Sequence, residues 1–80
     1  MNKKYISLDG LSIGQNCRIL RLAAVGSQRR RMLDLGLVSG TRVEMVHESP
    51  SGDISAYLVR GSVIALRSED ASQILVELCK

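Results

Sequence analysis

Residues 29–37 read RRRMLDLGL, and this stretch decides how the rest of the chain is interpreted. It joins a cluster of charges to a signal that ends a helix, because Gly36 readily adopts the left-handed backbone conformation found just past a helix terminus. The pattern predicts one short helix over Gln28–Leu35. In that arrangement Leu37 folds back onto Met32 to form a Schellman cap.

The predicted helix carries an unusual arrangement of charge. Ser27 suits the N-cap position, where a hydroxyl accepts a hydrogen bond from a free amide of the first turn. Arg29, Arg30 and Arg31 then lie near the positive end of the helix dipole and Asp34 near its negative end, the reverse of what the dipole favours. Arg30 and Asp34 are spaced to pair across one turn. Since a helix this short is unstable alone, its apolar residues must pack against another element.

Alternating apolar and polar residues predict about five strands, separated by turns rather than by helical crossovers. The strands are expected at Cys17–Leu22, Arg42–Glu48, Ile54–Arg60, Ser62–Leu66 and Ile74–Leu78. Gly40, Gly52 and Gly61 fall in the intervening turns. The pattern is typical of a mainly β fold, a small antiparallel β-barrel with one short α-helix between the first and second strands.

The core of this barrel is expected to be aliphatic, because the chain has no tryptophan or phenylalanine. Met32, Leu33 and Leu35 are expected to plug one open end of the barrel from the helix. Strand alternation places sets of side chains on common faces: Leu20 with Leu22; Val43 with Met45 and His47; Ile54 with Ala56 and Leu58; Ile64 with Leu66; Ile74 with Val76 and Leu78.

Length and composition indicate one small domain over residues 1–80, with 45% hydrophobic and 24% charged residues. No apolar run approaches the ~20 residues of a membrane helix, and the first ten residues lack the apolar core of a signal peptide. A cytosolic location is therefore expected. Cys17 and Cys79 should then be reduced and act as small apolar side chains, and they are neighbours if the first and last strands pair.

The formal charge of +3 and the isoelectric point near 9.2 suit an acidic partner, nucleic acid or an anionic membrane surface, without choosing among them. The three arginines accordingly have three interpretations: a solvated helix face, a contact with an acidic protein, or a contact with nucleic acid. Small barrels that bind single strands also use aromatic platforms, and this chain offers only Tyr5 and Tyr57.

No catalytic or metal-binding motif is apparent. The chain has one histidine, His47, and its two cysteines lie far apart, so no C-x-x-C or paired-histidine spacing marks a metal site. His47 is open to two interpretations, a ligand or a histidine packed at the rim of the core. Neither an enzyme, a resident metal nor a cofactor is expected.

The spacing of several residues along the chain resembles that of a known protein family. The run Arg31–Leu37 is followed by Gly40, by Pro50 with Gly52–Asp53, by Gly61, by Ile64–Arg67, and by Ala71 with Ile74. This spacing, over about residues 7 to 79, resembles the bacterial ferrous-iron transport protein A family, FeoA. The chain departs from the family at Ser39 and Ile54, where proline is common; both lie in turns that proline stiffens without being required.

The resemblance implies an SH3-like barrel and a role as a small cytosolic accessory protein of ferrous-iron uptake. The implied partner is FeoB, the membrane permease with a cytosolic GTPase domain, which would bring the protein to the inner face of the membrane. Related domains at the C-terminal end of iron-dependent repressors act as interaction modules. They leave an alternative, an SH3-like module for nucleic-acid binding or metal-responsive regulation. The family has no established catalytic residues, so none can be carried over. Arg29, Arg30 and Arg31 are the candidate partner-binding residues, because their position at the positive end of the helix dipole suggests a role other than stabilising the helix.

Overall fold

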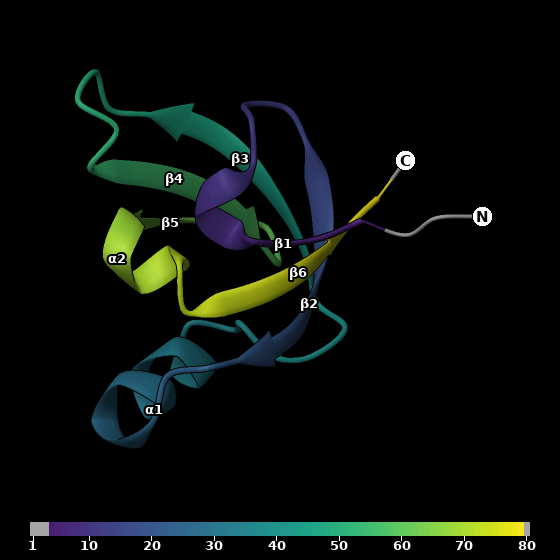
Figure 1. The fold of residues 1–80 in the computed structure, drawn as a ribbon, viewed down its shortest axis with the longest axis vertical. Coiled ribbons are helices and arrows are strands. Elements are labelled where there is room, and N and C mark those ends of the chain that lie inside the picture. Colours follow the sequence, from purple (N-terminus) through teal and green to yellow (C-terminus); the bar gives the residue numbers. More distant parts are fainter. Residues whose placement is uncertain (1–3, 80) are drawn as a thin grey trace.

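A computed structural model describes residues 4–79. Six strands form one antiparallel sheet in the order β1-β6-β2-β3-β4-β5, which curls around the core (Figure 1). The elements along the chain are β1 (Tyr5–Ser7), the 3-10 turn η1 (Leu8–Gly10), β2 (Asn16–Leu22), α1 (Gly26–Asp34), β3 (Arg42–Glu48), β4 (Ile54–Val59), β5 (Ser62–Arg67), α2 (Ser68–Ala71) and β6 (Ile74–Leu78).

The mainly β architecture with a short helix after the first long strand is confirmed, with one more strand than expected. The additional strand, β1, has only three residues and pairs with β6 from Tyr5↔Glu77 to Ser7↔Leu75. A strand of three residues is too short to show an alternation of apolar and polar residues in the sequence. The 3-10 turn η1 and helix α2 lie together beside the sheet, whereas α1 lies apart beyond the end of β2 (Figure 1). Within residues 4–79, no helix is long and apolar enough to span a membrane.

The core differs from the expected aliphatic one, because its largest fully buried side chain is Tyr57. Its hydroxyl donates a long hydrogen bond of 3.5 Å to the main-chain oxygen of Leu8, which gives the buried phenol a polar partner. In β4, the side chains of Tyr57 and Val59 therefore point into the core. The side chains on the opposite, outer face are those of Ile54, Ala56 and Leu58. The face expected from the apolar alternation of β4 is therefore the outer one.

Two β-bulges explain the other side chains whose predicted face differs from the observed one. The pairing of β3 with β4 shifts between Met45 and His47, so Met45 is buried whereas His47 is exposed. The pairing of β2 with β6 shifts between Ile19 and Arg21, which brings Leu22 onto the core face rather than onto the face of Leu20. A bulge adds one residue to one strand and reverses the parity of everything after it, which alternation alone does not reveal.

Candidate functional site

Helix α1 displays three consecutive exposed arginines. Its observed boundaries change the position of these arginines relative to the helix dipole. The helix begins at Gly26, two residues earlier than expected, with Val25 rather than Ser27 at the N-cap. Arg31 consequently lies in the last turn, where the dipole favours a cation. The expectation that all three arginines oppose the dipole is therefore wrong for Arg31.

The expected ion pair between Arg30 and Asp34 is also absent. Across residues 4–79, no carboxylate lies within ion-pair distance of any arginine of the cluster. Arg29 instead donates a long hydrogen bond, 3.4 Å, from Nη1 to the main-chain oxygen of Leu22. The guanidinium charges of α1 are thus left for solvent or for a partner.

The carboxyl end of α1 has the predicted Schellman cap. Gly36 has φ 93°, and the amides of Gly36 and Leu37 donate to the main-chain oxygens of Leu33 and Met32 over 3.0 and 3.1 Å. Leu37 and Met32 are buried and Leu35 packs partly against the core, but Leu33 is 38% exposed. The expected burial is therefore found for Met32 and in part for Leu35, whereas the expected burial of Leu33 is wrong.

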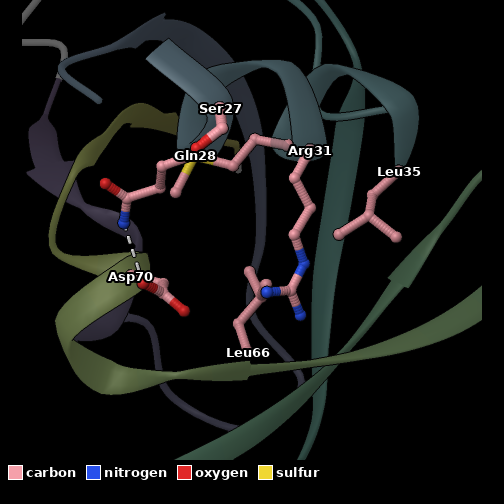
Figure 2. Close-up of a pocket in the computed structure, with 7 residues that line it drawn as sticks. Ser27, Gln28, Arg31, Leu35, Leu66 and Asp70 are labelled. Atoms are coloured by element: carbon pink, nitrogen blue, oxygen red, sulfur yellow. Dashed lines mark hydrogen bonds between the residues drawn. The ribbon is translucent and has the colours of Figure 1, made fainter. Parts of the chain in front are cut away.

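A cleft of about 290 Å³ separates α1 from β5 and α2. Figure 2 shows the Arg31 side chain leaving α1 and crossing this cleft toward Leu66 of β5. On the other side, Gln28 Nε2 donates a hydrogen bond of 2.8 Å to Asp70 Oδ1, which joins α1 to α2. Ser27, Met32 and Leu35 complete the lining. Arg31 thus belongs to the cleft, whereas Arg29 and Arg30 do not line it.

The possible metal ligands are scattered over the described part of the chain. Residues 4–79 hold no group of three or more His, Cys, Asp or Glu side chains placed to bind a metal ion. The amide of Cys79 donates to the main-chain oxygen of Asn16 over 2.9 Å, so Cys79 lies beside the β2 residue Cys17, and both are free thiols. Burial, with a smaller contribution from Cys79, raises the pKa of Cys17 to about 12, which keeps its thiol protonated and poorly suited to binding a metal.

Comparison with known proteins settles the relationship that these features suggest. A family model described as the FeoA domain matches residues 6–78. The chain belongs to the FeoA domain family. It is 35% identical over 71 residues, 89% of its length, to a fusion of Fe(2+) transport protein A with the Fe(2+) transporter FeoB from Porphyromonas gingivalis. The chain spans only 8% of that relative.

Solved FeoA structures share the fold. The FeoA-like protein of Clostridium acetobutylicum is 31% identical with a TM-score of 0.87, and the match covers 100% of this chain and 92% of the other. FeoA of Stenotrophomonas maltophilia, solved with zinc and described as a prokaryotic SH3 domain protein, is 25% identical with a TM-score of 0.78, covering 89% and 88%. The expected SH3-like fold is confirmed. A manganese-dependent transcriptional repressor shares the fold at 15% identity, which is evidence for the fold alone.

The cleft and the Gln28–Asp70 hydrogen bond were not foreseen from the sequence. Gln28 and Asp70 are separated by 42 residues, so no local spacing connects them. The remaining turn glycines of the FeoA-like motif behave as expected, since Gly40, Gly52 and Gly61 all have positive φ.

Proposed function

We propose that this domain is a non-enzymatic accessory protein of ferrous-iron uptake. It contacts the cytosolic part of a FeoB-type permease from the cytosolic side of the membrane. The observation that carries this proposal is the Porphyromonas gingivalis relative, in which a FeoA segment and FeoB belong to one polypeptide. Domains joined in one chain in one organism commonly act together, and separate chains achieve the same proximity by binding.

Arg29 and Arg30 are the residues we assign to this contact. Both are exposed on α1 and have no carboxylate partner within residues 4–79. Exposed arginines at a protein interface act mainly on the rate and salt dependence of association, and they select acidic partner surfaces. The third arginine, Arg31, points into the cleft and is assigned a different role below.

The alternative of nucleic-acid binding has less support from the side chains. Single-strand binding by small barrels relies on aromatic platforms. Tyr57, one of the two aromatic residues of the chain, is only 1% exposed, which leaves Tyr5 as the accessible ring. Metal-responsive regulation is suggested by fold likeness to manganese-dependent repressors at 15% and 16% identity, which is evidence for the fold alone.

An affinity pull-down from detergent-solubilised membranes of the native organism tests the proposal. The tagged domain should retain the permease, and the Arg29→Glu/Arg30→Glu variant should retain less of it. A matched control is Arg42→Glu/Arg60→Glu, because these two exposed arginines share a shallow hollow elsewhere on the barrel and the change in charge is the same. Recovery of nucleic acid without permease, or equal recovery of permease by both variants, would overturn the assignment.

A further inference from the structure

Strand β5 forms an edge of the sheet, and its pairing with β4 fixes which main-chain groups are unused. The amide of Ser68 donates to the Asp53 oxygen over 2.8 Å, in register with the pairs from Ile54↔Arg67 to Val59↔Ser62. Antiparallel strands alternate between residues that face the neighbour and residues that face away. The N–H and C=O groups that point outward are therefore those of Val63, Ala65 and Arg67. Among residues 4–79, the Arg67 oxygen is the N-cap carbonyl of α2 and accepts from the first turn of that helix. The outward groups without a backbone partner are therefore the N–H and C=O of Val63 and Ala65 and the N–H of Arg67.

The outer face beside this edge is apolar except for Arg67, which lies opposite Ile54. Ile54 is 46% exposed and Val63 is 63% exposed, and Ala56, Leu58 and Ala65 lie on the same side of the β4–β5 hairpin. The inner face of β4 is packed into the core. A strand that is apolar on both faces is typical of a sheet covered on both sides, and a contiguous exposed apolar patch marks an interaction surface.

Arg31 stands at the same edge and has no ion-pair partner within residues 4–79. A hollow of about 440 Å³ joins Arg31 to the β5 residues Ala65, Leu66 and Arg67, and the Arg31 guanidinium reaches toward Leu66 (Figure 2). Arg67 lies 3.9 Å from a carboxylate oxygen of Glu69. Glu69 and Asp70 also line this hollow, but neither lies within ion-pair distance of Arg31, and Asp70 Oδ1 accepts the Gln28 hydrogen bond. Arg31 is thus the cation of this edge that is open to a carboxylate from outside.

We propose that the outer edge of β5 binds an extended segment of a partner protein as an additional antiparallel strand, with aliphatic side chains and one acidic side chain. The segment's main chain pairs with both main-chain groups of Val63 and Ala65 and with the N–H of Arg67, as in other cases of strand addition. Its acidic side chain reaches Arg31, whose planar guanidinium suits a carboxylate. Its aliphatic side chains cover Val63 and Ile54.

The absence of an acidic residue in β5 disfavours a second copy of this chain as the added strand. Antiparallel pairing of β5 with its own copy would bring the sequence SVIALR to the edge, which contains no acidic residue for Arg31 and adds a second Arg67. The edge therefore fits a different segment better than itself. This site excludes Arg29 and Arg30, so it succeeds or fails independently of the permease contact proposed above.

Amide hydrogen exchange by NMR tests the proposal, with the acetylated and amidated hexapeptide TVLEVT as the probe. In the free protein the amides of Val63, Ala65 and Arg67 should exchange quickly while those of Ile64 and Leu66, bonded to β4, exchange slowly. The peptide should protect the first three and leave the other two unchanged. Of two peptides N-methylated at alternate residues, only one should bind, because just one set of peptide amides faces β5.

Arg31→Gln should weaken binding of the glutamate peptide roughly tenfold and leave a glutamine-substituted peptide unaffected, whereas Arg30→Gln should change neither. Slow exchange at Ile64 and Leu66 reports that each variant is folded. The proposal is overturned if millimolar peptide protects none of the three outward amides, or if both N-methylated peptides bind equally. It is also overturned if the same amides become protected without peptide as protein concentration rises, which would make a second copy the occupant.

Discussion

Gln28 and Asp70, 42 residues apart, are joined by a hydrogen bond of 2.8 Å that connects α1 to α2 across the cleft. Helix α1 is otherwise held by Met32, its one buried residue, and by the long hydrogen bond from Arg29 to the Leu22 oxygen. Leu35, at its C-cap, packs partly against the core. The bond therefore helps to set the width of the cleft that Arg31 crosses.

The Gln28–Asp70 bond should be measurable as an interaction energy. A double-mutant cycle with Gln28→Ala and Asp70→Ala should give a coupling of about 0.5–1.5 kcal/mol in the free energy of unfolding, the range for a typical hydrogen bond. Because both groups contact solvent, the value should fall in the lower half of that range. Urea denaturation of the four proteins measures it. Strictly additive effects would mean that the bond does not hold the helices together in solution.

Two neighbouring residues of α1 should respond very differently to truncation. Met32 is 3% exposed and lies in the core, so Met32→Ala should cost about 2–5 kcal/mol. Leu33 is 38% exposed, and Leu33→Ala should cost less than ~1 kcal/mol. Thermal and urea melts of both variants provide the comparison. If Leu33→Ala were the more damaging, the helix would be rotated about its axis relative to the arrangement described.

The sequence predicted α1 and the five longer strands because each carries a local signal, whereas the three-residue strand β1 was missed. The bounds of β3, Arg42–Glu48, follow directly from alternation between turn residues, and the Gly36 cap follows from one glycine after a helical turn. The face of β4 could not be inferred, since Ile54, Ala56 and Leu58 look more like core than Ser55, Tyr57 and Val59 do. Only the completed sheet shows that the tyrosine reaches inward to Leu8.

The candidate sites likewise include one feature that the sequence alone predicts and two that depend on the tertiary structure. Exposure of Arg29 and Arg30 could be expected from their polarity alone. The separate position of Arg31 depends on where α1 sits relative to β5, a tertiary arrangement that spacing does not encode. The unused edge of β5 likewise follows from the order of six strands, of which one was too short to detect.

Cys17 makes stability fall at alkaline pH. Burial raises its pKa from 9.0 to about 12, so the folded state keeps the proton where the unfolded chain loses it. The contribution of the protonated Cys17 thiol to the free energy of unfolding is complete below pH 9. It is lost as pH rises from 9 toward 12. Tyr57, whose pKa burial also raises, acts in the same direction above its ordinary value of 10.0. In Cys17→Ala the unfolding free energy should decline less steeply over this range, and an identical decline would contradict the assignment.

The isolated domain should not hold ferrous iron tightly. Residues 4–79 contain no cluster of three potential ligands, and Cys17 is kept protonated. Anaerobic titration with ferrous iron, followed by calorimetry, should show no stoichiometric site at low micromolar concentration. A stoichiometric site at that affinity would overturn the prediction. Loss of the site in His47→Ala or in Cys79→Ala would then identify its ligand.

Arg29 and Arg30 are central to the proposed permease contact, and their removal should separate binding from folding. Arg29→Glu removes the long hydrogen bond to the Leu22 oxygen, whereas Arg30→Glu removes no contact within residues 4–79. The double variant should therefore melt within a few degrees of the wild type. The control Arg42→Glu/Arg60→Glu carries the same net charge and should bind as the wild type does.

Titration of the purified cytosolic GTPase domain of the FeoB-type permease, at low and high salt, is the direct test of the proposed contact through Arg29 and Arg30. The wild-type domain should bind with an affinity that falls as salt rises, and the Arg29→Glu/Arg30→Glu variant should bind at least roughly tenfold more weakly at low salt. Unchanged binding by a variant that melts normally would contradict the account and assign the two arginines to a solvated face.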